Sequence, residues 1–253
     1  MNFFLKDIPK RTIKPRTDGL TMVMDKGLSV NDTKNFIDMS GPHTDIIKLG
    51  FGTSAISPHI EKKIELYQKA GLKVYLGGTL FEAFLIRGMY NEYKDLLKKW
   101  GLNMCEVSDG SIVLDHNEKC KYIADLSKDF TVVSEVGSKD EKKLIPPYKW
   151  IELMEKEISS GAWKVIAESR EGGNVGIYRS GGDVRSDLID EILTKIPTEK
   201  IMWEAPKKPQ QVWFIKLLGA NVNLGNISWD EVIPLETLRL GLRGDTFFDY
   251  LNI

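Results

Sequence analysis

The chain has 253 residues, of which 42% are hydrophobic and 28% are charged, and its formal net charge at pH 7 is −1. This is an ordinary soluble composition with enough apolar residues for a sizeable core. Because the net charge is close to zero, no overall electrostatic field favours binding of nucleic acid or of an anionic membrane. The net charge does not exclude a local basic pocket.

The cysteines and the N-terminal segment bear on the cellular compartment. Cys105 and Cys120 do not form a C-x-x-C pair and cannot build a disulfide framework, so we expect reduced, buried thiols. The start, MNFFLKDIPKRTIKPR, lacks the apolar run of a signal peptide. No stretch approaches the roughly 18 apolar residues of a membrane span. We therefore expect a cytoplasmic enzyme or binding protein.

Short β-rich runs alternate with helical patterns along the chain, which predicts βα units and a parallel sheet. The predicted strands are residues 19–25, 44–49, 72–76, 103–107, 130–136, 162–168, 200–205 and 220–224. The predicted helices are residues 31–39, a stripe at Ile60, Ile64 and Tyr67, residues 79–100, 118–126 and 149–159, stripes at Leu188, Ile192 and Ile196 and at Val212, Ile215 and Leu218, and residues 230–242.

Two of the connections have local signals of their own. Thr79 can cap the helix over residues 79–100, with Glu82 as its capping-box partner, and Gly101 ends that helix. The loop over residues 170–185 is long and rich in glycine. Loops of this length usually carry function or are disordered.

Eight strands and eight helices in 253 residues predict an α/β protein with a single (β/α)8 TIM barrel. We expect this one domain to cover residues 1–253, with residues 1–18 as an N-terminal extension. An open doubly wound sheet is the alternative. Such a sheet usually has a glycine fingerprint after its first strand, and the segment MDKGLSV has none.

Acidic residues end several predicted strands, where the active site of such a barrel lies. These residues are Asp25, Glu106, Glu135, Glu168 and Glu204. Carboxylates that meet at one rim would repel one another unless a cation joined them, and an oxygen-rich site of this kind suits Mg²⁺. A network of salt bridges to neighbouring lysines and arginines is the alternative interpretation.

Basic residues form the second half of the predicted site. Lys26, Lys48, Lys139 and Arg170 lie at or just after strand ends, and Arg179 lies in the long loop. Taken alone, such a residue is more often a solvated surface charge, but Lys48 lies inside the apolar run DIIKLGFG. The segment NVNLGNIS is the predicted phosphate site, because phosphate often binds by the loops after the last two strands. An ordinary turn is the alternative there.

Other residues carry weaker signals. A Schiff-base lysine is conceivable at Lys164, but this residue begins its strand, at the face of a barrel that usually serves stability. His43, His59 and His116 show no metal-ligand spacing, and we expect His43 and His59 to be surface or packing residues.

The strand-end segments are, in chain order, GLTMVMDKG, IIKLGFGT, YLGGTLFE, EVSDG, EVGSKD, VIAESREGG, WEAPKKPQQ, NVNLGNIS and LRLGLRGDT. Together they resemble the phosphosulfolactate synthase family, from about Lys14 to Thr246. The resemblance implies a (β/α)8-barrel enzyme, a carbon–sulfur lyase, that needs Mg²⁺ and adds sulfite to phosphoenolpyruvate to give (2R)-phospho-3-sulfolactate. In archaea this reaction opens a route to coenzyme M, bacterial members make sulfolactate-type products, and plant relatives are associated with heat acclimation.

The implied reaction suggests roles for the strand-end residues. Sulfite would attack the CH₂ carbon of phosphoenolpyruvate, charge would build on the substrate carboxylate, and an acid would protonate the adjacent carbon. We assign Glu135, Glu168 and Glu204 to Mg²⁺, with Asp25 and Glu106 as reserves. The predicted substrate-binding residues are Lys26, Arg170, Arg179, Asn223, Gly225 and Asn226.

Two lysines are predicted to be catalytic, Lys48 beside the reacting anions and Lys139 as the proton donor. A lysine crowded by other cations can have its pKa lowered enough to donate a proton. In the family a pair of lysines often follows the segment EVG, and here Ser138 takes the first position and Lys139 the second.

Two other functions remain open. One is a non-catalytic protein of the same fold that acts through partners in stress tolerance, and the other is a different barrel lyase or aldolase on a phosphorylated carboxylic acid. We expect small-molecule substrates, neither nucleic acid nor membrane as a partner, and a homo-oligomer.

Overall fold

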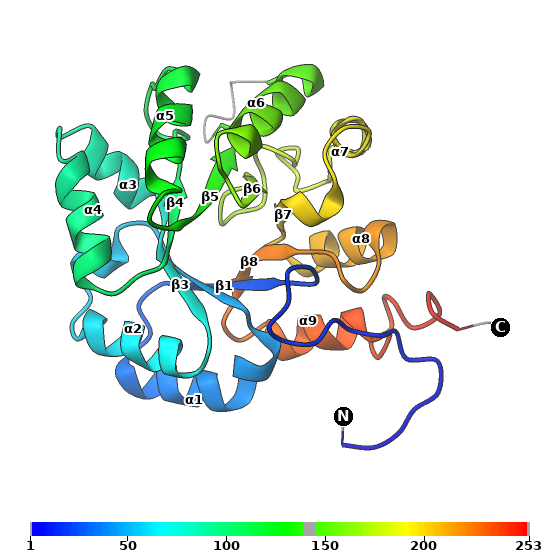
Figure 1. Ribbon diagram of the computed structural model, residues 1–253. Coiled ribbons are helices and arrows are strands. Elements are labelled where there is room, and N and C mark those ends of the chain that lie inside the picture. Colours follow the sequence, from blue (N-terminus) through cyan, green and yellow to red (C-terminus); the bar gives the residue numbers. More distant parts are fainter. Residues whose placement is uncertain (1, 139–144, 252–253) are drawn as a thin grey trace.

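The computed structural model describes residues 2–138 and 145–251. It shows a (β/α)8 barrel of parallel strands with helices around it, which confirms the predicted fold (Figure 1). The strands are β1 (Thr21–Asp25), β2 (Ile46–Leu49), β3 (Lys73–Leu76), β4 (Met104–Val107), β5 (Thr131–Val136), β6 (Lys164–Ala167), β7 (Ile201–Glu204) and β8 (Leu224–Ser228). The helices are α1 (Val30–Ser40), α2 (Ile60–Lys69), α3 (Gly78–Leu85), α4 (Tyr90–Lys99), α5 (His116–Leu126), α6 (Pro147–Ser159), α7 (Ser186–Leu193), α8 (Lys208–Leu218) and α9 (Val232–Arg239).

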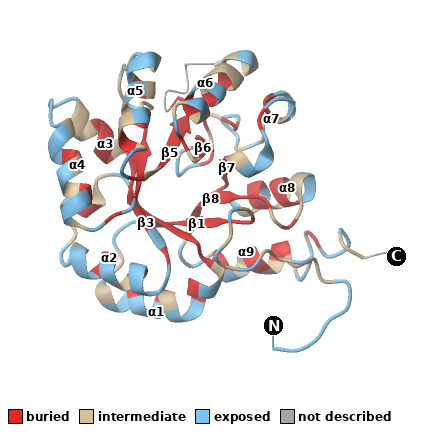
Figure 2. Cartoon of the chain, viewed as in Figure 1, coloured by how far each residue is buried: buried red, intermediate tan, exposed pale blue. Residues whose placement is uncertain are grey.

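The strands are almost entirely buried, because the sheet is covered on both faces. Outward-facing side chains such as Val23, Ile47 and Val165 belong to the main core beneath the helices. A second cluster fills the inside of the barrel, with Met22, Ile46, Tyr75, Met104, Val133, Ile166 and Met202 among its members. Figure 2 shows buried strands at the centre and exposed outer helix faces. This two-sided burial explains why the strands have near-continuous apolar sequences.

The barrel has one seam, between β3 and β4. The hydrogen-bonded strand order runs β3-β2-β1-β8-β7-β6-β5-β4, and β3 and β4 lie in contact at its two ends. Helix α3 bridges this β3–β4 seam: the Gly78 backbone N–H donates to Glu106 Oε1 at 3.0 Å. The side chain of Glu82, one turn further along α3, reaches Ser108 just beyond β4. Side chains at the carboxyl ends therefore help to close the barrel.

Two predicted elements are wrong: the helix over residues 79–100 and the last strand. The single helix expected over residues 79–100 is divided into α3 and α4, because Gly88 takes the left-handed conformation, with a φ of 69°, between them. Glu82 consequently is no capping-box partner of Thr79, since α3 begins at Gly78 with Gly77 as its N-cap.

The predicted last strand, over residues 220–224, lies too early in the chain. A turn in which Val222 N–H donates to the Gly219 carbonyl at 3.2 Å takes up its first residues, and β8 begins only at Leu224. The other strands overlap their predicted ranges. The last helix, expected over residues 230–242, is the shorter α9.

The N-terminal segment, residues 2–18, has no helix or strand among its described residues and lies against the amino ends of the strands. Arg11 donates to the carbonyls of Gly19 at 3.0 Å and Ala220 at 2.8 Å, and its Nε lies 2.9 Å from Glu236 Oε1. Further along, Arg16 pairs with Asp45 at 2.8 Å. This segment thus links the residues that precede β1 to the residues that precede β8.

We expect Arg11→Ala to lower the free energy of unfolding by about 3 kcal/mol, because it leaves the largely buried Glu236 carboxylate without its Arg11 partner and removes one donor from each of the Gly19 and Ala220 carbonyls. Urea unfolding followed by circular dichroism measures this change. Arg179→Ala is the matched control: Arg179 has a side chain 63% exposed and should cost less than about 0.5 kcal/mol. If both variants were as stable as the parent, Arg11 would not stabilise the barrel through these contacts.

Candidate active site

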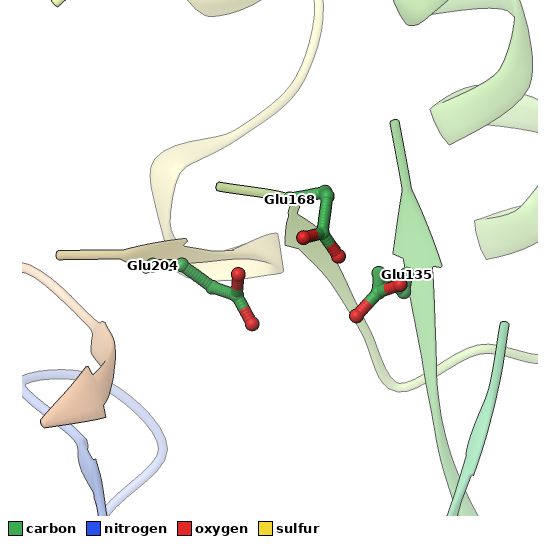
Figure 3. A group of neighbouring side chains, drawn as sticks. All are labelled: Glu135, Glu168 and Glu204. Carbon is green, nitrogen blue, oxygen red and sulfur yellow. The ribbon is translucent and has the colours of Figure 1, made fainter. Parts of the chain in front are cut away.

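Three carboxylates converge at the carboxyl end of the barrel. Glu135 lies near the end of β5, Glu168 directly follows β6, and Glu204 ends β7. One oxygen from each side chain lies within 4.8 Å of the others, and all three residues are buried. Figure 3 shows the carboxylates directed toward one another from neighbouring strands. The structure thus brings together the three residues predicted as metal ligands.

Lys48, from β2, joins this cluster from the opposite side of the barrel. Its Nζ lies 3.1 Å from Glu106 Oε2, 3.4 Å from Glu204 Oε1 and 3.6 Å from Glu135 Oε2. Burial alone would lower the pKa of Lys48, but the negative charge of Glu106, with those of Glu204 and Glu135, outweighs burial and raises it well above the usual value. Lys48 is therefore charged at neutral pH.

Backbone N–H groups hold the carboxylates in place. The amide of Arg170 donates to Glu168 Oε1 at 2.5 Å, and the amide of Ser169 donates to Glu204 Oε2 at 2.9 Å. Arg170 adopts a positive φ of 54° as the chain turns sharply after β6. Gly137 has a φ of 141°, and a Cβ there would lie 2.6 Å from Glu168 Cβ, so the glycine of the EVG segment leaves room for this carboxylate. The oxygens are oriented before any ligand arrives.

Lys119 anchors the main chain of Glu135 from outside the barrel. Its Nζ donates to the Glu135 carbonyl at 2.6 Å and lies 2.8 Å from Asp109 and 2.9 Å from Glu157. A cavity of about 450 Å³ beside this lysine is lined by residues 109–114 after β4, by residues at the end of β5, and by residues of α5 and α6. It does not contain the carboxylate cluster, so we do not regard it as the active site.

The carboxylate cluster opens into a pocket of about 300 Å³. The pocket is lined by Met24, Lys48, Phe51, Gly78, Thr79, Glu106, Glu135, Glu168, Arg170, Glu171, Glu204 and Asn226. Of the predicted substrate-binding residues, Arg170 and Asn226 therefore face this space. A volume of this size fits a small molecule.

Asp25 points away from the pocket. Its Oδ2 lies 2.6 Å from Lys63 Nζ and accepts from the Tyr67 hydroxyl at 3.0 Å, and its Oδ1 accepts from the amides of Gly27 and Leu28. Adjacent strand residues face opposite sides of a sheet, and here Met24 lines the pocket while Asp25 faces α2. The prediction of Asp25 as a reserve ligand did not take this alternation into account.

Two other predicted substrate-binding residues lie away from the pocket. Asn223 precedes β8 at the amino end of the barrel, where its side chain accepts from Leu20 N–H at 3.1 Å and donates to the Ile201 carbonyl at 3.0 Å. Its expected place at a strand end followed from the misplaced last strand. Gly225 lies inside the barrel, where a Cβ would be 2.7 Å from Met22 Cε, so close packing accounts for this glycine.

The remaining predicted basic residues lie at the surface or outside the described residues. Arg179 lies 3.5 Å from Asp187, with both side chains 63% exposed, and Lys26 pairs with Glu171 at the rim. Lys139 belongs to residues 139–144, which lie outside the described part of the chain.

Lys164 lies where its position in the strand predicted, at the amino end of the barrel. Its ammonium donates to the Glu199 carbonyl, and burial, with the nearby charge of Lys200, lowers its pKa to about 8. A lowered pKa is typical of Schiff-base lysines. Lys164, however, begins β6 and is not among the residues that line the pocket.

Sequence reasoning missed Glu82 and Ser108 as parts of the site. Glu82 is only 2% exposed, accepts from the Ser111 amide at 3.0 Å and contacts the Ser108 hydroxyl. That hydroxyl also lies 2.9 Å from Glu135 Oε1. The available signal was a single acid within the otherwise apolar segment GTLFEAFL.

A (β/α)8 barrel with carboxylates and a charged lysine buried at its carboxyl end has the architecture of an enzyme for small anionic substrates. The profile of the family described as (2R)-phospho-3-sulfolactate synthase (ComA) matches residues 9–245. The chain belongs to this family, which confirms the resemblance and the prediction of an enzyme.

Individual relatives agree. The phosphosulfolactate synthase of Bacillus subtilis is 40% identical over 251 residues, covering 98% of this chain and 100% of the relative. That of Methanocaldococcus jannaschii is 41% identical over 236 residues, covering 90% of this chain and 94% of the relative. Among solved structures, 3-hexulose-6-phosphate synthase from Salmonella typhimurium superposes with a TM-score of 0.59 at 15% identity, covering 88% of this chain and 100% of that one. This structural likeness concerns the fold alone.

We expect Lys48→Met to lower the free energy of unfolding by about 3–5 kcal/mol at pH 7, because it removes the cation that contacts three buried carboxylates. Since the pKa of Lys48 is higher in the folded than in the unfolded chain, this stabilisation is complete at neutral pH and is lost only as the pH rises through the folded-state value. Urea unfolding at pH 7 measures the difference.

Lys26→Met is the control for this substitution, because Lys26 is 43% exposed at the same rim and contacts only Glu171 among its described ion-pair partners. It should change stability by no more than about 1 kcal/mol. If Lys48→Met were no more costly than Lys26→Met, Lys48 would not be the counter-charge of the cluster.

Proposed function

We propose that the chain catalyses the Mg²⁺-dependent addition of sulfite to phosphoenolpyruvate, giving (2R)-phospho-3-sulfolactate. The observation that carries the proposal is the convergence of Glu135, Glu168 and Glu204 beside Lys48 in a pocket of about 300 Å³. Family membership supports the identity of the product. The carboxylates and the charged lysine of the pocket support a metal and anionic substrates.

The donor set fits a hard divalent cation. Mg²⁺ prefers oxygen ligands at about 2.0–2.1 Å and usually takes one or two carboxylates together with waters and substrate oxygens. Carboxylate oxygens that lie within 4.8 Å of one another can approach one such ion with small side-chain movements. Glu135, Glu168 and Glu204 would hold it. Glu106 stays a reserve ligand, since Gly78 N–H and Lys48 already contact its oxygens.

When bound, the metal supplies Lewis-acid stabilisation of negative charge on the substrate carboxylate. Lys48 lies next to Glu135 and Glu204 and stays protonated, so it can offset part of that charge. Arg170 at the pocket wall offers a second positive charge for sulfite or carboxylate. Asn226 offers a side-chain amide, and we place the phosphate on that side of the pocket.

The reaction forms one carbon–sulfur bond and removes one carbon–carbon double bond. The sulfur lone pair of sulfite attacks the CH₂ carbon, the π electrons move toward the carboxylate, and a proton then adds to the phosphate-bearing carbon. We propose Lys139 as the donor of that proton, because it follows Glu135 closely in sequence. We also propose that Arg179, in the loop after β6, and Lys26, at the rim, help to attract the anionic substrates.

No helix in the described part of the chain is long and apolar enough to cross a membrane. We propose that the enzyme acts in the cytoplasm as a homo-oligomer, with small molecules rather than nucleic acid or membrane as its partners.

Purified protein with sulfite, phosphoenolpyruvate and Mg²⁺ is expected to yield phosphosulfolactate, and EDTA is expected to abolish its formation. Glu204→Gln should lower turnover strongly because it removes one of the charged oxygens for the cation. Phosphorus NMR and mass spectrometry of the product measure both effects.

Glu236→Gln is the matched control, because it alters a buried glutamate at the opposite end of the barrel. It should leave turnover close to the parent value. Absence of a sulfonated product with and without EDTA would refute the proposed reaction, and undiminished turnover in EDTA would refute the metal requirement.

Lys139→Ala is expected to reduce turnover by about 10²–10⁴-fold, the usual contribution of a general acid. Substrate binding, folding and Mg²⁺ binding should change little. Steady-state kinetics across pH, with circular dichroism as a check of folding, measures the loss and the accompanying limb of the pH profile. A variant with full activity would exclude Lys139 as the proton donor.

A further inference from the structure

The long loop after β6, residues 170–185, begins close to the point where β6 and β7 stop pairing. The last paired residues of these two strands are Ala167 and Trp203. Glu168 and Glu204 follow directly after them, so two of the three clustered carboxylates belong to residues just beyond this ladder. The pairing of β6 with β7 therefore does not extend to the residues that carry the carboxylates.

The loop returns to these two residues and contacts the main chain of each. The Ile177 amide donates to the Glu168 carbonyl at 3.1 Å, and the Tyr178 hydroxyl donates to the Glu204 carbonyl at 2.6 Å. Gly176 allows the loop to come this close: its φ is 64°, and a Cβ on it would lie 2.0 Å from the Glu168 carbonyl oxygen. The loop thus holds both main chains where the ladder between β6 and β7 has ended.

The loop is itself anchored to the barrel wall. Gln210, a buried residue of α8, donates through Nε2 to the carbonyls of Gly173 at 2.8 Å and Gly182 at 3.2 Å. Within the loop, Tyr178 and Val184 form an antiparallel bridge. These contacts connect both halves of the loop to one helix, so the position of the Tyr178 ring is set by packing and not by a ligand.

Tyr178 lies next to the cation site without lining the pocket. Its side chain is buried, and the residue is not among those that line the space around the carboxylates. The hydroxyl contacts the carbonyl of Glu204, whereas Oε2 of the same residue accepts from the Ser169 amide at 2.9 Å. Tyr178 therefore bears on where the Glu204 main chain lies, and so on the point from which the carboxylate extends. Metal ligands have to be held to within about 0.5 Å by surrounding groups.

We propose that Tyr178 is a positioning residue for the cation site: by holding the Glu204 carbonyl, it sets the place from which the Glu204 carboxylate reaches the metal. Tyr178 acts through this main chain and touches neither metal nor substrate. The inference rests on the proposed metal at Glu135, Glu168 and Glu204, but it concerns metal affinity and does not depend on the identity of the substrates.

Tyr178→Phe tests the proposal, because it removes the hydroxyl and keeps the ring in the core. We expect affinity for Mn²⁺ to fall about 10-fold, the lower end of the usual range for a group that supports a metal ligand. Electron paramagnetic resonance of free Mn²⁺ in a titration of the full chain measures the affinity, and Mg²⁺ competition extends it to the proposed metal. Circular dichroism checks that the variant is folded.

Tyr67→Phe is the matched control. Tyr67 is also buried, and its hydroxyl donates to Asp25 Oδ2 at 3.0 Å, on the side of β1 that faces away from the pocket. This variant loses a buried hydroxyl hydrogen bond as well, but it should leave Mn²⁺ affinity within about twofold of the parent value. An equal loss of affinity in both variants would show a general loosening of the barrel and would overturn the proposal.

Two further backgrounds test whether Tyr178 acts through Glu204. In Glu135→Gln, which alters a ligand that the loop does not contact in these hydrogen bonds, Tyr178→Phe should still lower Mn²⁺ affinity about 10-fold. In Glu204→Gln its effect should shrink to less than about threefold, because the carboxylate that it positions is gone. The same loss in both backgrounds would contradict a role through Glu204.

Hydrogen exchange of the parent chain measures the same coupling without a substitution and serves if Tyr178→Phe does not fold. Because linkage between two sites is reciprocal, saturating Mg²⁺ should slow exchange of the amides of residues 170–185 by about the factor that the loop contributes to metal affinity. Unchanged exchange in the loop would refute the inference.

The outcomes separate this inference from the proposed function. If the parent protein bound neither Mn²⁺ nor Mg²⁺, both the metal proposal and this inference would fall. If the parent bound Mn²⁺ and Tyr178→Phe bound it equally well, only the positioning role of Tyr178 would be refuted.

Discussion

The structure depends on the burial of several carboxylates at the carboxyl end of one barrel. Ionised carboxylates are costly to bury unless they are paired or bound to a cation. Here the cost is offset by Lys48, which contacts Glu106, Glu135 and Glu204, and by backbone amides that donate to Glu106, Glu168 and Glu204. The Gly78 and Ser169 amides follow the neighbouring strands β3 and β6, so Glu106 and Glu204 also join adjacent parts of the rim, whereas the Arg170 amide belongs to the same loop as Glu168. An added cation would relieve the remaining repulsion, so the charges that are costly to bury would also give the proposed site its affinity for a metal.

The two ends of the barrel divide stability and chemistry between them. At the amino end, the side chains of Arg11, Arg16 and Arg239 bind carbonyls and carboxylates near the starts of the strands. These contacts close that end of the barrel, and none of the three arginines lines the pocket. At the carboxyl end, the seam between β3 and β4 is bridged by hydrogen bonds to Glu106 and Ser108. Gly78 and Glu106, which bridge the seam, thus also line the pocket of the proposed cation site.

The fold and the main carboxylates could be predicted because both follow from local patterns. An acid that directly ends a buried parallel strand must emerge at the common rim, and Glu135, Glu168 and Glu204 satisfy this condition. The errors arose where the local pattern was ambiguous. Asp25 also ends a strand, but the alternation of side chains turns it toward Lys63. Asn223 was misplaced because the alternating sequence Ala-Asn-Val-Asn of a turn resembled the start of β8. Glu82 resembled a helix-cap residue, although tertiary contacts bury it.

The pKa of Lys48 separates the roles of the two lysines that sequence reasoning considered catalytic. A general acid works best when its pKa lies near the working pH, whereas carboxylate contacts raise that of Lys48 well above its usual value. Lys48 is therefore suited to hold negative charge and poorly suited to release a proton. A donor must then lie outside this cluster of opposite charges, among cations rather than carboxylates. The two halves of the reaction, charge stabilisation and protonation, consequently require opposite electrostatic surroundings for the same type of side chain.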